Sequence, residues 1–187
     1  MTNIVSDVSS IDRLRHRLIG PCKCMRLLAA LWFLSSAAQT IWNWSDRTKI
    51  LDNYSRWLKI DVTQAPAFDY ALASFLLLVD HLVAFGIFVA VWRLTATCMA
   101  GHVFSLAASK GLKQIANAAF LSLSADILIR HLVQLVLTWH APSSGFPLKL
   151  ALNSIDALHL LIICFIFSLG QMFKTAAEIA EEQAGFV

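Results

Sequence analysis

Ionisable residues interrupt three apolar stretches of this chain, at positions where the centre of a lipid bilayer would fall. They are Asp80, His81, Asp126, Arg130, His131, Asp156 and His159. A charged side chain at the centre of a bilayer costs roughly 2.5–3.5 kcal/mol on insertion scales. We therefore expect these side chains to face the interior of a helix bundle, where they can contact one another, rather than lipid.

Spacing and depth indicate which of these residues can meet. Asp126 and Arg130 are four residues apart and share one helix face, as do Asp156 and His159, which are three apart. At 1.5 Å per residue, Asp80, Asp126, Arg130 and His159 lie roughly 12–20 Å from the external ends of their helices, and Asp156 roughly 9 Å. The sequence thus predicts a buried polar cluster of Asp80, Asp126, Arg130, Asp156 and His159.

The polar cluster has two interpretations that the sequence leaves open. In one, it is a structural clasp, since buried polar contacts fix helix register at about 0.6 kcal/mol each in one membrane protein. In the other, it is a proton- or ion-linked site, because carboxylates and histidines exchange protons readily in such settings.

Three histidines, His81, His131 and His159, lie in different stretches at compatible depths, which permits bis-histidine ligation of a haem b or binding of a metal. The chain has no CxxCH sequence, so any haem would be non-covalent. No cofactor and no metal site are expected, and haem is an alternative. Because His81 points about 100° away from Asp80 on a helix, we expect the two not to face the same groove.

The elements that position these residues are membrane-spanning helices. Hydrophobic residues make up 58% of the 187 residues, charged residues 14%, and mean hydropathy is +0.65. In soluble domains, hydrophobic residues average about 45–50% and charged residues about 25%. Four segments reach the ~20 residues that a span needs, at about 25–44, 68–91, 112–139 and 150–173. We predict one all-α domain (1–187), a four-helix transmembrane bundle with an N-terminal arm (1–24) and a C-terminal tail (174–187).

Residues 46–61 predict an amphipathic helix between the first two spans. Its apolar face comprises Ile50, Leu51, Tyr54, Trp57 and Leu58. Such a helix lies in the outer membrane interface or caps the mouth of the bundle. A solvated loop is the alternative. Between the second and third spans, Gly101 permits a bend and Ser105 can cap the next helix.

Charge predicts the orientation and excludes some classes of function. With both termini in the cytoplasm, nine Lys and Arg residues lie inside and five outside, as the positive-inside rule favours. A net charge of +3 is too small to suggest nucleic-acid binding. No catalytic motif is present, so no catalytic residue is assigned and an enzyme is not expected.

Sequence motifs in the C-terminal half give the chain a family resemblance. They are a Gly-x-x-Phe-Ser elbow (Gly101, Phe104, Ser105) and an acidic tail that closes in Phe-Val (Glu181, Glu182, Phe186, Val187). With the basic N-terminal arm, the chain resembles a bacterial inner-membrane family catalogued as domain of unknown function 2975. The resemblance implies four transmembrane helices, no established activity and no catalytic residues to carry over. Asp80 and His81 depart from that family's mostly apolar pattern.

The leading prediction is a non-enzymatic regulatory or accessory subunit of the bacterial inner membrane that acts through protein contacts. The alternative is a proton-coupled transporter or channel subunit that uses the buried Asp/Arg/His cluster, and a second alternative is a b-type haem protein. Expected partners are the lipid bilayer and either further copies of the chain or another membrane protein.

Overall fold

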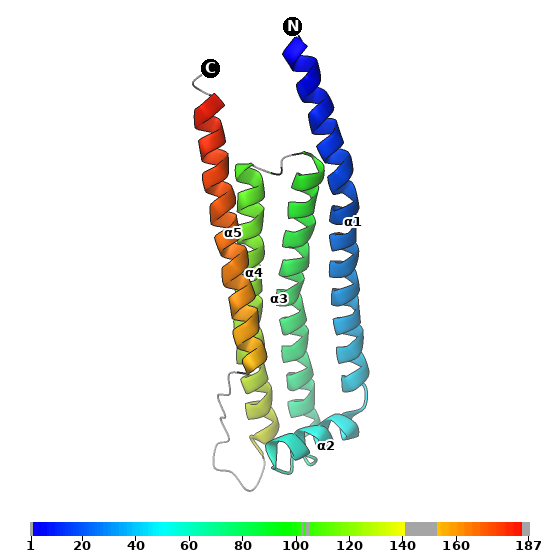
Figure 1. The fold of residues 1–187 in the computed structure, drawn as a ribbon. Coiled ribbons are helices and arrows are strands. Elements are labelled where there is room, and N and C mark those ends of the chain that lie inside the picture. The colour runs from blue at the N-terminus through cyan, green and yellow to red at the C-terminus, as the bar shows by residue number, and fades with distance from the viewer. Residues whose placement is uncertain (1, 102, 104, 141–152, 185–187) are drawn as a thin grey trace.

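Five α-helices make up the computed structural model, which describes residues 2–101, 103, 105–140 and 153–184, with side chains from residue 18 to residue 183. They are α1 (Thr2–Trp44), α2 (Arg47–Leu58), α3 (Ala67–Met99), α4 (Leu106–Thr138) and α5 (Ser154–Ala184) (Figure 1). No strand occurs in these residues. The predicted all-α fold, with an amphipathic helix between the first two long ones, is confirmed.

Four of the helices are long and apolar enough to cross a membrane. Their candidate spans are Leu18–Trp44, Ala67–Met99, Leu106–Thr138 and Ser154–Gln183. The chain is therefore a multi-pass integral membrane protein. At 1.5 Å per residue, α3 and α4 are about 50 Å long, which exceeds the ~30 Å hydrocarbon core, so their ends project into the headgroup regions.

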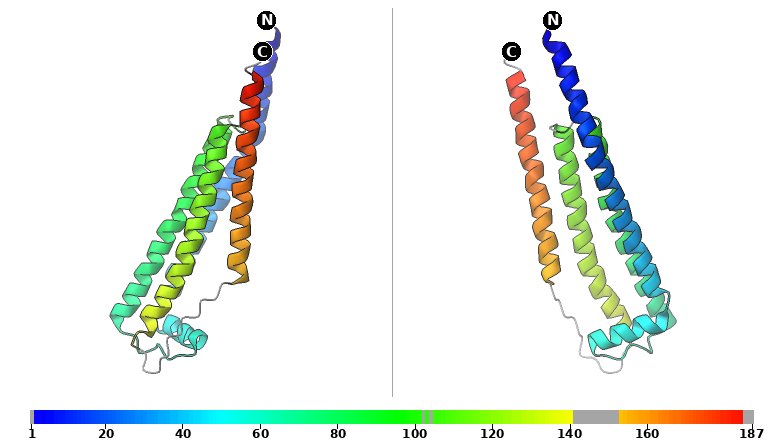
Figure 2. Two further views of the ribbon diagram at one scale, coloured as in Figure 1. Left: turned by 90° about the vertical axis from the view of Figure 1, so that its left-hand side faces the viewer. Right: turned by 45° about the vertical axis from the view of Figure 1, so that its right-hand side comes forward.

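The long helices form an open bundle. Helix α1 packs on α3, α3 on α4 and α4 on α5, whereas no extensive packing joins α1 to α5 in the described residues. In Figure 2, α1 and α5 lie on the same side of the α3–α4 pair. Both chain ends lie at one end of the bundle (Figure 1), as four spans require.

The turn between α3 and α4 follows the sequence prediction. Gly101 has a φ of 92°, a left-handed conformation that glycine adopts without strain. The hydroxyl of Ser105 accepts a hydrogen bond from the backbone N–H of Ala108 at 3.2 Å and caps α4. His102 and Phe104, which contribute to the predicted elbow, lie outside the described residues.

Small residues let α3, α4 and α5 pack closely near this turn. A Cβ atom added to Gly111 in α4 would lie 2.8 Å from the Cδ1 atom of Leu94 in α3. The buried hydroxyl of Ser109 donates to the carbonyl oxygen of Gly170 in α5 at 2.8 Å. These contacts hold the three helices together at the end where the chain termini lie.

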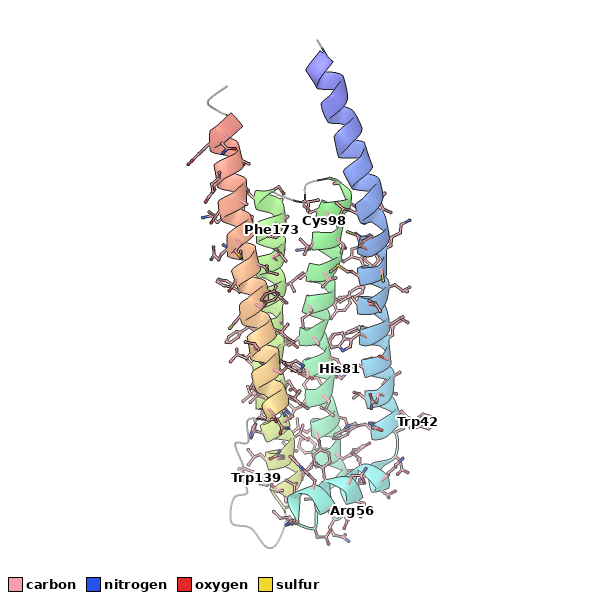
Figure 3. All side chains as sticks on the ribbon, in the orientation of Figure 1. Trp42, Arg56, His81, Cys98, Trp139 and Phe173 are labelled. Carbon is pink, nitrogen blue, oxygen red and sulfur yellow. The ribbon has the colours of Figure 1, made fainter. Side chains whose placement is uncertain are left out.

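Helix α2 closes the opposite end, which we call the α2 end (Figures 1 and 3). The side chain of Asp46 caps α2 by accepting from the backbone N–H groups of Thr48 and Lys49. Ile50 and Leu51 are buried in a cluster with residues of α3 and α4, while Trp57 is 64% exposed. Of the two placements expected for this helix, the structure therefore favours a cap over the bundle mouth.

Two parts of the predicted organisation fall partly outside the described residues. The fourth span was expected from residue 150, and α5 begins at Ser154, with residues 141–152 outside the described residues. Helix α1 continues through the predicted arm to Thr2, but the side chains of residues 2–17 are not described.

Candidate intramembrane site

A cavity of about 400 Å³ lies at the level of the predicted polar cluster. Its walls come from α1, α3, α4 and α5, so it occupies the space between α1 and α5, which do not pack extensively on each other in the described residues. We call it the polar groove. Its polar lining residues are Ser36, Asp80, His81, Ser122, Asp126 and His159. The remaining lining is apolar, including Trp32 of α1 and Ile162 of α5.

Arg130 in α4 joins two carboxylates beside this groove. Its guanidinium lies 3.0 Å from Oδ2 of Asp126 and 2.9 Å from Oδ1 of Asp156. The predicted pairing of Asp126 with Arg130 along one helix face is thus confirmed. The Asp156 side chain is 6% exposed, whereas those of Arg130 and Asp126 are 36% and 43% exposed. The guanidinium of Arg130 therefore pairs with the carboxylates of both Asp126 and Asp156.

Asp156 has a second role at the start of α5. Its Oδ2 atom accepts a hydrogen bond from the backbone N–H of Asn153 at 2.9 Å. Because α5 begins at Ser154, Asp156 lies in its first turn, near the α2 end. The long side chain of Arg130 spans the difference in depth between Asp126 and Asp156.

Asp80 borders the groove from α3 without such a cation. One of its carboxylate oxygens, Oδ1, is completely buried and has no hydrogen-bond partner in the described part of the chain. The structure thus divides the predicted cluster. Asp80, Asp126 and His159 share the groove, while Asp126 and Asp156 share Arg130.

His81 joins α3 to α1. Its Nε2 atom lies 3.3 Å from the hydroxyl of Thr40 and 3.5 Å from that of Ser36. The expectation that His81 and Asp80 cannot border one groove is wrong, because both line it. The groove extends from α1 to α4, so two side chains about 100° apart on α3 both reach its wall.

The three histidines of the haem alternative have different surroundings. His131 is not among the residues that line the groove, and its Nδ1 atom lies 2.5 Å from the carbonyl oxygen of Ile127. His81 and His159 both line the groove, and Nδ1 of His81 lies 3.0 Å from the carbonyl oxygen of Leu77. The described residues also contain no cluster of three metal-ligating side chains.

Two polar contacts that attach α1 to α3 have no counterpart in the sequence analysis. The Nε atom of Arg26 donates to the hydroxyl of Thr95 at 2.8 Å, and its guanidinium lies 4.3 Å from the ring centroid of Trp92. Near the α2 end, the hydroxyl of Tyr70 donates to the carbonyl oxygen of Trp44. These partners are far apart in sequence, so no local spacing signals them.

The α2 end contains a further ionisable pair. The carboxylate of Asp69, at the start of α3, lies 2.8 Å from Nδ1 of His140, just beyond α4. Asp69 is 5% exposed. A cavity of about 310 Å³ between α2 and α4 extends from Tyr54 to Arg130. Burial raises the pKa of Tyr54, which borders this cavity from α2.

Comparisons with known proteins add no identity to this geometry: no family model, no curated protein and no solved structure matches the chain.

Proposed function

We propose that this protein is a non-enzymatic regulatory or accessory subunit that acts through contacts with another membrane protein. The observation that carries the proposal is the open side of the bundle. Helices α1 and α5 leave a groove between them, and the groove contains ionisable side chains that the described residues do not fully pair. Buried polar groups are ordinarily hydrogen-bonded. A bundle that acted alone would be expected to close over them.

We place the protein in a bacterial inner membrane with both termini in the cytoplasm. The distribution of Lys and Arg supports this orientation, and the position of both termini at one end of the bundle is consistent with it. The resemblance to the family of domain of unknown function 2975 supports the bacterial origin.

The C-terminal end of α5 is a second contact surface in this proposal. Glu181 and Glu182 are exposed, while Glu178 pairs with Lys174 at 3.2 Å along the helix.

Purification of the tagged protein at native expression level, from mild detergent, tests the proposal. We expect another membrane protein at fixed stoichiometry by mass spectrometry. The double variant Glu181→Lys and Glu182→Lys should weaken that association while membrane insertion stays intact. Purification of the chain alone, or as a homo-oligomer without a partner, would contradict the proposal.

A second candidate function rests on the buried oxygen of Asp80 that has no partner in the described part of the chain. A proton-coupled transporter or channel subunit would use Asp80, Asp126, Arg130 and His159. Since transporters usually build their sites between repeats, four spans would have to assemble with other copies of the chain or with a partner. This candidate predicts a pH-dependent flux in proteoliposomes that Asp126→Asn abolishes. Absence of flux with the parent protein would exclude it.

A further inference from the structure

The polar groove has more negative than positive charge in its described part. Three carboxylates, those of Asp80, Asp126 and Asp156, lie in or beside it with one guanidinium, that of Arg130. Arg130 pairs with Asp126 and Asp156, and not with Asp80. His81 directs its Nε2 atom toward hydroxyls of α1. The chain therefore provides no described cation in contact with Asp80.

Asp80 lies deep in the membrane. It is 13 residues from Ala67, the first residue of α3, which corresponds to about 20 Å of helix. The hydrocarbon core is ~30 Å thick, so Asp80 is well inside it. A carboxylate at this depth requires a donor or a cation, because lipid tails supply neither.

The rims of the polar groove offer contact surface to a further helix. The floor of the groove is the α3–α4 pair, and its rims are α1 and α5, which do not pack extensively together in the described residues. Exposed apolar side chains line both rims, with Trp32 on α1 at 53% exposure and Ile162 on α5 at 46%. The rims thus offer apolar surface to a helix whose polar group meets Asp80.

We propose that the polar groove binds one transmembrane helix of another protein, and that this helix carries a lysine or arginine at the depth of Asp80. The inference rests on the proposed function and names the chemistry of the partner. The apolar part of the incoming helix packs against Trp32 and Ile162, and its cation pairs with Asp80. Arg130 already forms such pairs within the chain. Charge-assisted hydrogen bonds of this kind are stronger than neutral ones.

Synthetic transmembrane helices test the proposal with the purified full-length protein in phosphatidylcholine vesicles. One peptide is a Leu/Ala helix of about 21 residues with a single central lysine, and its matched control has leucine there. Energy transfer from labelled peptide to labelled protein reports binding. We expect the lysine peptide to bind about tenfold or more tightly than the leucine peptide.

Protein variants connect this preference to the groove. Asp80→Asn should abolish the preference for lysine, whereas Asp52→Asn, on exposed α2, should leave it unchanged. Because Asp80→Asn can alter folding, Ser122→Phe provides an independent variant that fills the groove from α4. It should weaken binding of the lysine peptide as well.

Three results would overturn the proposal. They are equal binding of the two peptides, a preference for lysine that persists in Asp80→Asn, and displacement of the peptide by a second copy of the chain. Each leaves the proposed function standing if a partner still copurifies. Conversely, copurification of no partner would refute the proposed function even where the peptides bind as expected.

Discussion

Buried carboxylates have different surroundings at the α2 end and in the polar groove. At the α2 end, the buried carboxylate of Asp69 has a partner within the chain, His140, and α2 covers an apolar cluster formed with α3 and α4. In the groove, one oxygen of Asp80 is buried without a partner among the described residues, and α1 and α5 do not pack extensively on each other there. This difference agrees with a stabilising role for the α2 end and with the binding role that we propose for the groove.

Removal of the shared cation should have the largest effect, because Arg130 borders both regions. Arg130→Met leaves Asp156 buried without its cation and Asp126 unpaired. Since Arg130 is partly exposed, we expect a loss of about 2–3 kcal/mol in the free energy of unfolding, below the value for a fully buried pair. Equilibrium unfolding in mixed detergent micelles measures it.

The control for this variant is Arg56→Met, which breaks the exposed pair of Arg56 with Asp52 on α2. Its cost should stay below about 0.5 kcal/mol. Equal costs for the two variants would mean that the Arg130 pairs contribute no more than an exposed surface pair.

Asp69→Ala should have the next largest effect, because it removes the buried partner of His140 at the α2 end. We expect a loss of about 1–2 kcal/mol in the same unfolding measurement. Binding of the lysine peptide to the folded fraction should not change, because Asp69 does not line the groove. A weakened peptide affinity without a loss of stability would reverse the roles that we assign to the two regions.

Glycine substitutions in α3 and α4 should have effects of opposite sign. Gly111→Ala places a Cβ atom 2.8 Å from Leu94, so the helices must separate slightly, and we expect a loss of about 1 kcal/mol. Gly86→Ala meets no atom within 4 Å, and alanine favours the helix by roughly 0.5–1 kcal/mol. If Gly111→Ala were as stable as Gly86→Ala, α3 and α4 would not be closely packed near the turn that joins them.

The cap of α2 should show the smallest effect, as a pH dependence. Hydrogen bonds from the Thr48 hydroxyl and the Lys49 N–H are the main causes that hold the pKa of Asp46 below its ordinary value of 3.8. The stabilisation is therefore complete above that value and is lost as pH falls through the lowered pKa. Hydrogen exchange at the Thr48 and Lys49 amides should accelerate in this range, beyond the intrinsic change with pH.

Asp46→Asn is the matched variant for the cap, since asparagine also caps helices but does not titrate in this range. It should remove the pH dependence and keep α2 protected at neutral pH. An unchanged pH dependence in this variant would assign the effect to another carboxyl group.

Contacts between residues that are close in the sequence could be predicted from it. The i, i+4 spacing predicted the pair of Asp126 with Arg130, and the apolar face of residues 46–61 predicted α2. Turn chemistry predicted the roles of Gly101 and Ser105. In each case the residues that interact lie within one or two helical turns.

Contacts that depend on how the helices are arranged could not be predicted from the sequence. The pairs of Asp69 with His140 and of Arg26 with Thr95 join residues about 70 positions apart. The position of His81 depended on how wide the groove is, which helix phase alone does not specify. The absence of extensive packing between α1 and α5 likewise has no signal in a chain whose spans are all apolar.

Photo-crosslinking in native membranes tests most directly whether another protein occupies the polar groove. A photoreactive aromatic residue in place of Trp32, which lines the groove and is 53% exposed, is compared with one in place of Leu34, which is 63% exposed on α1 and is not among the lining residues. We predict one specific protein adduct from position 32, its loss when Asp80→Asn is added, and no such adduct from position 34. Crosslinks to lipid alone from both positions, or an adduct that persists with Asp80→Asn, would contradict this prediction.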